Sequence, residues 1–188
     1  MNDILRVIRQ RRSIRKFLST PVTDDVIEAI LEAGKRAPCA MNRQERHFTV
    51  IQSGQMLAEL NRESKAIAAG LENRYLSQMA QSENYNIFYH APLAILVSGP
   101  AEKAMIESDC AAAIQNMLLA AESLGYGGCW INFVLFVFQG PKDEAYRTKL
   151  GIPEGYRPYG SVVIGLKGDE PAGERISQGN TVNYIRSF

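Results

Sequence analysis

A run of basic residues near the N-terminus is the first part of this sequence whose side chains are suited to binding chemistry. Six Lys or Arg residues fall between positions 6 and 16, although the whole chain is balanced, with 21 basic and 20 acidic residues. Arg11, Arg12, Ser13 and Arg15 stand together in this run. The guanidinium group is a planar set of donors that fits phosphate oxygens, and a serine hydroxyl adds one more donor. The run is therefore suited to a phosphate-bearing ligand, but from this segment alone we favour a solvated basic surface or a nucleic-acid contact.

A polar loop is expected where Pro38 ends the second predicted helix. It continues through Cys39, Ala40 and Asn42 to Gln44. The side-chain amides of Asn42 and Gln44 each offer a donor and an acceptor, which suits the edge of a heteroaromatic ring. Amide residues such as Asn are also common in ordinary turns, so this loop alone indicates a ligand only weakly.

A glycine-rich segment with one aromatic residue is the third candidate. Three glycines between positions 125 and 128 are followed by Trp130, Ile131 and Asn132. Glycine lets a backbone approach a ligand closely, and Trp130 and Ile131 are suited to covering an apolar ring. The end of a helix followed by a core strand accounts for the same residues, and without other support we favour that interpretation.

The spacing of apolar residues predicts the elements that position these segments. Helices are expected over residues 3–10, from Thr23 to before Pro38, over most of 53–82 with a break near Gly70, over 108–124, and from Pro141 to Gly151. Strands are expected over 48–51, 93–97 and 161–164, with strand or buried extended chain over 129–138. Residues 93–97 are apolar on both faces, which predicts a central strand. Helix 108–124 is apolar on a wide face, so it lies in a large core or meets a partner.

Length and composition predict one ordinary globular domain. The chain has 188 residues, of which 46% are hydrophobic and 22% charged. Helices and strands alternate irregularly, and no strand is followed by a GxGxxG turn, so a Rossmann domain is disfavoured. The balanced charge gives no reason to expect a nucleic acid or a membrane as partner. The longest apolar stretch, 129–138, is too short to cross a bilayer.

Histidine and cysteine usage narrows the chemistry further. His47 and His90 are the only histidines and have no metal-ligand spacing, so no metal site is expected. Cys39, Cys110 and Cys129 are far apart and form no paired framework, which is typical of a reducing, cytoplasmic setting.

Five short sequences occur along this chain in a specific order. They are Arg11–Arg15, Pro38–Gln44, Tyr89–Pro92, Ala111–Ile131, and Arg175 ahead of Asn183–Ile185. Each sequence alone is unspecific. In this order, over essentially the whole length, they resemble the signatures of the FMN-dependent nitroreductase family.

The resemblance implies a role for each matched position. Arg11, Ser13 and Arg175 would bind the FMN phosphate, with Arg12 and Arg15 on the phosphate and pyrimidine side. Pro38, Cys39, Ala40, Asn42 and Gln44 would come from the partner subunit. Trp130, Ile131 and Asn132 would pass one face of the isoalloxazine, with a backbone N–H near Asn132 directed at flavin N5. Asn84 would reach the ring edge.

The resemblance also implies the fold and the reaction. The fold would be an α+β nitroreductase-like domain over residues 1–188, forming an intertwined homodimer with shared sites. The tail, about 176–188, would pack on the partner subunit. NADH or NADPH would reduce FMN, and a nitroaromatic, a quinone or a similar small-molecule acceptor would then be reduced by a ping-pong mechanism. No residue acts as catalyst of its own, because the flavin carries the chemistry.

Three alternatives to this function stay open. One is a specialised family reaction: flavin remodelling, carbon–halogen cleavage or oxidation of a peptide ring, decided by the lid segment over 63–86. Another is a flavin-binding protein without turnover, and the last is a small nucleic-acid binder. The chain also departs from the family pattern, since Cys39 replaces a serine, Glu45-Arg46 replaces Pro-Trp, and Ile131-Asn132-Phe133 lacks the common glycine. Glu45-Arg46 suggests a more polar rim to the substrate pocket.

Overall fold

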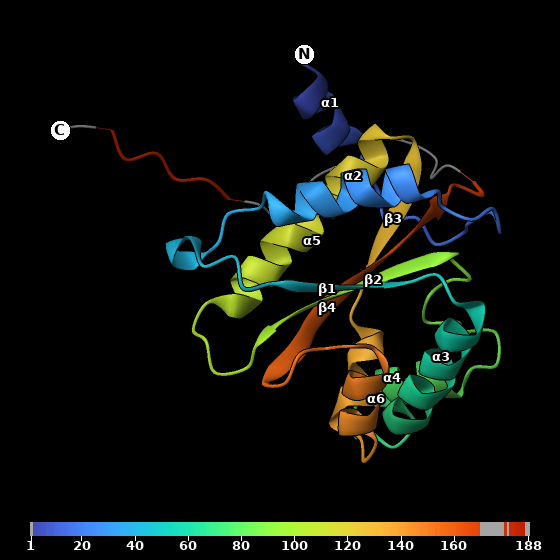
Figure 1. Ribbon diagram of the computed structural model, residues 1–188. Coiled ribbons are helices and arrows are strands. Elements are labelled where there is room, and N and C mark those ends of the chain that lie inside the picture. The colour runs from blue at the N-terminus through green and yellow to red at the C-terminus, as the bar shows by residue number, and fades with distance from the viewer. Residues whose placement is uncertain (1, 170–178, 180, 187–188) are drawn as a thin grey trace.

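An antiparallel sheet lies between two layers of helices in the computed structural model, which describes residues 2–169, 179 and 181–186 (Figure 1). The strands found in these residues are β1 (His47–Ile51), β2 (Leu93–Pro100), β3 (Tyr126–Ile131) and β4 (Tyr156–Leu166). They stand in the order β1-β2-β4-β3, and each neighbouring pair is antiparallel. This arrangement confirms the expected α+β class, with a mostly antiparallel central sheet wrapped by helices.

β2 is buried on both faces, as its unbroken apolar sequence predicted. It pairs with β1 on one side and β4 on the other, and its residues 93–97 have no exposed surface. Leu93, Ile95 and Val97 pack into one apolar core, while Ala94 and Leu96 pack into another. Because successive side chains of a strand point to opposite faces, the sheet separates the two cores.

The first core lies beneath α2 (Asp24–Lys35) and α5 (Ile106–Ser123), and α1 (Asp3–Gln10) extends from its edge. α5 begins two residues before the predicted helix over 108–124 and packs against both α2 and the sheet, which explains its wide apolar face. Thr23 stands at the N-cap of α2, as predicted. Its hydroxyl donates to the Asp25 carboxylate instead of accepting a backbone N–H, so the helix start has no side-chain cap from Thr23.

The second core lies under α3 (Gly54–Ala68), α4 (Arg74–Gln81), the 3-10 helix η2 (Phe133–Gln139) and α6 (Asp143–Lys149). The prediction of strand or extended chain over 129–138 was wrong beyond Ile131. The extended backbone stops at Asn132, where ψ is −12°. Phe133, Val134 and Val137 are buried, so the apolar residues that follow have helical spacing and pack on α3.

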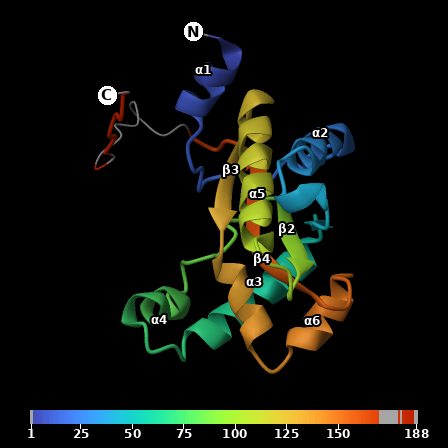
Figure 2. The ribbon, with the colours of Figure 1, turned by 90° about the vertical axis from the view of Figure 1, so that its left-hand side faces the viewer.

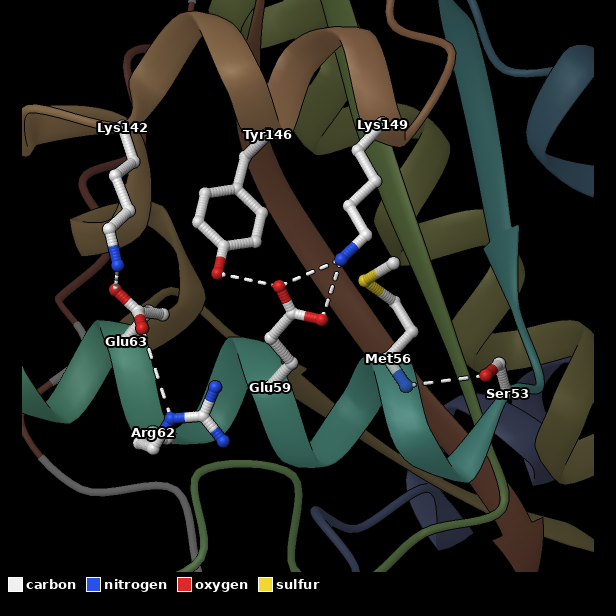
Figure 3. A network of polar contacts seen from close by, with 8 residues as sticks. All are labelled: Ser53, Met56, Glu59, Arg62, Glu63, Lys142, Tyr146 and Lys149. Atoms are coloured by element: carbon white, nitrogen blue, oxygen red, sulfur yellow. Dashed lines mark hydrogen bonds and ion pairs between the residues drawn. The ribbon is translucent and has the colours of Figure 1, made fainter.

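A network of charged and polar side chains joins α3 to α6 (Figure 3). Glu59 of α3 accepts from Lys149 Nζ at 2.7 and 2.8 Å and from the Tyr146 hydroxyl at 3.0 Å. One turn further along α3, Glu63 pairs with Lys142 Nζ at 2.9 Å. These contacts fix the short helix α6 against a longer one.

The described part of the tail, residues 181–186, extends away from the helical layers (Figure 1). Val182, Tyr184 and Ile185 are 73–82% exposed in the single chain. The other residues of the predicted tail lie largely outside the described ones, so its packing on a partner subunit stays a prediction. No helix in the described residues is long and apolar enough to cross a membrane.

Candidate functional site

The basic segment after α1 runs along the free edge of β3. Ser13 forms a parallel bridge with Gly128, and the Ile14 N–H donates to the Gly128 carbonyl at 3.0 Å. A Cβ on Gly127 would lie 2.7 Å from Ile14 Cγ1, closer than real Cβ contacts come. The glycines of this segment therefore make room for the protein's own chain. The idea that they admit a ligand's close approach is wrong at Gly127, and also at Gly128, where Leu118 fills the space.

Several polar groups of this segment converge on Cys129 of β3. The buried thiol has a raised pKa because of burial, which the positive charges of Arg15 and Arg11 and a hydrogen bond from Ser13 oppose. Arg15 also reaches the ring of Tyr89, whose centroid lies 5.8 Å from its guanidinium carbon, and a hydrogen bond to Tyr89 raises the pKa of Arg15. Arg11, Ser13 and Arg15 thus present donors along one edge of the sheet.

An aromatic group continues from Tyr89 toward η2. Tyr85 stacks edge-on against Tyr89 at 6.1 Å and against Phe133 at 5.5 Å, and burial raises its pKa. Lys65 of α3 donates to the carbonyls of Ser82 and Tyr85, which ties the segment after α4 to the body of the protein. Asn84 is exposed in that segment, next to Tyr85. The sequence drew attention to Tyr89 only through the step into β2 and missed Tyr85.

Trp130, Ile131 and Asn132 lie at the end of β3. Ile131 is buried, and Trp130 is on the other face with 36% of its surface exposed. The indole Nε1 donates to Asn132 Oδ1 at 2.7 Å, and Gly160 of β4 lies beneath, where a Cβ would come 3.1 Å from Nε1. The hydrogen bond that the indole donates to Asn132 fixes the indole plane, so Trp130 offers a preset flat apolar surface.

The loop after α2 contains a 3-10 turn, η1 (Ala40–Asn42), with unusual backbone angles. Met41, Asn42 and Gln44 all have positive φ, between 52° and 55°. Gln44 Nε2 donates to Asn42 Oδ1 at 2.9 Å, and the Gln44 backbone N–H donates to Cys39 Sγ at 3.3 Å. The two amides expected to meet a ligand are therefore ordered by each other.

Two residues that sequence reasoning did not single out hold this loop. The Asp109 carboxylate of α5 accepts the Ala40 N–H at 2.9 Å, and the Arg46 guanidinium donates to backbone carbonyls of the chain. Asp109 was detectable as an acidic residue on an otherwise apolar helix face. Because the Arg46 guanidinium donates to the protein's own backbone, it does not form the polar rim that the sequence suggested. Glu45 pairs with Lys103 at 3.8 Å.

The candidate residues form two groups on one chain. Two elements, α2 and β3, lie on opposite sides of α5 (Figure 2). α2 leads into the loop of Pro38–Gln44, and the basic segment runs along β3. Arg11, Arg12, Ser13 and Arg15 share the β3 side with the segment of Trp130–Asn132. Pro38, Cys39, Ala40, Asn42 and Gln44 are on the α2 side. Arg175 lies outside the described residues.

The donor set beside Cys129 fits a phosphate. Arg11 and Ser13 supply charged and neutral donors of the kind that phosphate prefers, whereas the exposed surface of Trp130 lies on the opposite face of β3. In the described residues, no three His, Cys, Asp or Glu side chains are grouped as a metal site would need.

Comparisons with known proteins point the same way. The model of the nitroreductase family matches residues 8–166. A protein of Archaeoglobus fulgidus, provisionally named NADH dehydrogenase/NAD(P)H nitroreductase, is 33% identical over 90% of this chain and 88% of its own length. A nitroreductase of Bacteroides fragilis with bound FMN has a TM-score of 0.91 and 37% identity, covering 99% of this chain and 100% of that one.

A second solved structure, the nitroreductase of Desulfitobacterium hafniense with bound FMN, has a TM-score of 0.90. It is 30% identical and covers 99% of this chain and all of that one. The family model spans both the basic segment and β4, so it includes all the candidate residues except Arg175. The chain therefore belongs to the nitroreductase family.

Proposed function

We propose that this protein is an FMN-dependent oxidoreductase that takes its reducing equivalents from NAD(P)H and reduces flat, electron-poor acceptors such as nitroaromatics and quinones. The observation that carries the proposal is the row of donors at Arg11, Ser13 and Arg15 along β3, in a fold that two FMN-bound nitroreductases share at TM-scores of 0.90 and above. When bound, FMN would supply the hydride chemistry; the chain's residues would bind and orient it.

The β3 side would hold the phosphate and one face of the flavin. In this proposal Arg11 and Ser13 donate to the phosphate, with Arg175 as a further donor. Arg12 and Arg15 lie on the phosphate and pyrimidine side, where positive charge favours the reduced, anionic ring. The segment of Trp130, Ile131 and Asn132 would pass one face of the flavin, with a backbone N–H near Asn132 directed at N5, and Asn84 would reach the ring edge.

The α2 side would complete the site of a second copy of the chain. The loop of Pro38, Cys39, Ala40, Asn42 and Gln44 is separated from its own chain's basic segment by α5 (Figure 2). In a homodimer, this loop would close the flavin site of the partner subunit, so each dimer would have two shared sites. Residues 1–188 would form a single domain. A reducing, cytoplasmic setting would fit the three free cysteines.

The hydride donor, NAD(P)H, and the electron-accepting substrate would use the same pocket in turn. The chain has no dinucleotide fingerprint, so NAD(P)H has no separate site suggested by the sequence. A flat pocket between Trp130 and the partner's loop would admit the nicotinamide first and the acceptor after the oxidised nicotinamide leaves. This order is a ping-pong mechanism.

Steady-state kinetics test the shared pocket. Initial rates are measured with a quinone and with a nitrofuran at several fixed concentrations of NADH and of NADPH. The proposal predicts parallel lines in double-reciprocal plots. Intersecting lines, together with direct binding of an acceptor to the protein while NADP⁺ is bound, would contradict it.

A further inference from the structure

We propose that Arg46 and Asp109 are positioning residues that hold the loop of residues 38–44 in the conformation that completes the flavin site of the partner subunit. The inference rests on the proposed function, because it concerns the same FMN site. It adds that FMN affinity at one site is controlled by two side chains of the other subunit that do not touch the cofactor.

Arg46 connects the end of α2 to the start of α5. Its Nη2 donates to the carbonyls of Lys35 at 3.2 Å and Ala37 at 2.9 Å, and its Nη1 donates to those of Pro38 at 3.2 Å and Asp109 at 3.3 Å. The carbonyls at a helix C-terminus carry partial negative charge, which a guanidinium stabilises. One side chain therefore fixes where the loop leaves α2 and where it lies against α5.

Asp109 fixes Ala40, further along the loop. Asp109 is 9% exposed in the single chain, and its Oδ1 accepts the Ala40 N–H at 2.9 Å. A hydrogen bond from a backbone N–H to a carboxylate is stronger than one between neutral groups. The same residue supplies the backbone carbonyl that Arg46 contacts, so Arg46 and Asp109 act on one short stretch of chain.

The loop needs this support because its backbone is in an unfavourable conformation. Met41, Asn42 and Gln44 have positive φ, which only glycine adopts without cost. Met41 is also 82% exposed, so burial of its own side chain does not hold it in place. Such a conformation persists only where the surrounding structure fixes it. Without Arg46 or Asp109, the loop must be ordered when the ligand binds, and that ordering weakens affinity.

Single variants give the first test. Arg46→Met and Asp109→Ala should each raise the FMN dissociation constant of the dimer by about tenfold or more, measured by fluorescence titration of FMN-depleted protein. Asp109→Asn keeps an acceptor oxygen for Ala40 and should stay within a few-fold of wild type. Arg36→Met is the matched control, because it removes an exposed arginine at the same helix end that pairs with Glu32.

A mixed dimer tests the action across the interface. One tagged chain carries Arg11→Ala and the other, with a different tag, carries Arg46→Met; the heterodimer is purified on both tags. One site then combines an intact basic segment with an intact loop, and the other site carries both defects. The proposal predicts one FMN of wild-type affinity per heterodimer, although both homodimers bind weakly. The same result is expected with Asp109→Ala in place of Arg46→Met.

The outcomes separate this inference from the proposed function. Failure of the wild-type protein to bind FMN overturns both. Weak binding by Arg11→Ala with unchanged binding by Arg46→Met and Asp109→Ala overturns only the role of the loop supports. A heterodimer in which no site has wild-type affinity shows that Arg46 acts through general stability or on its own subunit's site, and overturns the inference as stated. If Arg46→Met does not fold as a homodimer, the Asp109→Ala heterodimer decides.

Discussion

At the scale of single residues, Cys39 shows how a substitution can keep a local structure while changing its chemistry. The family usually has serine here, and in this chain the sulfur accepts the Gln44 backbone N–H at 3.3 Å. A serine oxygen would accept the same N–H at a shorter distance. The thiol is half-buried and serves as an acceptor within the loop, so its place in the structure gives it no need to act as a nucleophile.

Changing Cys39→Ser should therefore leave reductase turnover within a few-fold of wild type, a barrier change of about 1 kcal/mol or less. Cys39→Ala removes the acceptor for Gln44 and should weaken FMN more than Cys39→Ser does. Both are measured as kcat with a quinone acceptor and as the FMN dissociation constant. Complete loss of turnover in Cys39→Ser with FMN still bound would show instead that the thiol takes part in the reaction.

The residue types of the candidate site were predictable, but their supports were not. Arg11, Ser13 and Arg15 attract attention because their donors are rare in such density in a balanced chain. Arg46 differs from them only in where its side chain points, and a sequence does not specify that. The sequence suggested that it belongs to a polar rim of the substrate pocket. In the structure its guanidinium donates to backbone carbonyls at the end of α2, which have no partner within the helix.

At the scale of elements, the contact between α3 and α6 depends on charge. α6 has only seven residues, too few for a stable isolated helix, and Tyr146 is its one buried side chain. The hydroxyl of Tyr146 and the ammonium of Lys149 both donate to Glu59, and they lower the pKa of that carboxyl. Ionised Glu59 is thus favoured by folding.

This coupling predicts how stability depends on pH. A carboxyl whose pKa is lowered by folding adds stability above its unfolded pKa, about 4.3, and loses that contribution as the pH falls through the folded value. Glu59→Gln should lower Tm at pH 7 by no more than about 2–4 °C, and the difference from wild type should shrink as the pH falls below about 4.3 and disappear only below the folded pKa. Thermal unfolding followed by circular dichroism measures both.

The control for that experiment is Glu28→Gln, which neutralises an exposed carboxylate of α2. It should show no comparable difference from wild type at either pH. A constant Tm difference between Glu59→Gln and wild type from pH 7 down to pH 3.5 would mean that the ionised carboxylate is not what stabilises the contact.

Elements with a strong apolar pattern were predicted well from the sequence. β2 is an unbroken apolar run that is buried on both faces, and the buried apolar residues of α5 recur at helical spacing. The run Phe133–Phe138 is apolar throughout, so its period could not be read, and only the turn of the backbone at Asn132 decides for a 3-10 helix. The segment over 63–86 contains the end of α3 and all of α4, as the helical pattern indicated.

At the scale of the whole molecule, the single chain exposes apolar surface on one side. α1 has no buried residue, and its Ile4, Leu5 and Ile8 are 49–71% exposed. An open pocket of about 530 Å³ between α1, α2 and α5 is lined mainly by apolar residues, including Val7 and Leu119. Large exposed apolar patches mark interaction surfaces, so we expect a second copy of the chain to cover this one.

The protein should therefore be an obligate homodimer, with an interface on the order of 2,000 Å² or more. Sedimentation at micromolar concentration should give twice the chain mass of 20.9 kDa. Ile8→Asp places a charge in the exposed apolar face of α1, and should shift the protein toward monomer and lower its FMN content together. A folded, flavin-loaded wild-type monomer would contradict the shared site.

The division of the site between two faces of one chain was not visible in residue spacing. The loop contacts α5 through Asp109 and the basic segment runs along β3, and the spacing of these residues in the sequence alone would allow them to meet. Only the packing of α2 and β3 on opposite sides of α5 separates them. The resemblance to the family implied this separation, and residue patterns contained no independent sign of it.

The most direct test of the account is the identity and reactivity of the bound cofactor. The protein is purified without added flavin, its visible spectrum is recorded, and the cofactor is released by heat and identified by mass spectrometry. The account predicts a yellow protein with about one FMN per chain whose flavin band is bleached by NADH or NADPH without oxygen and restored by a quinone. A colourless protein that does not take up FMN, a released cofactor that is only FAD, or a bound flavin that neither nucleotide reduces would contradict it.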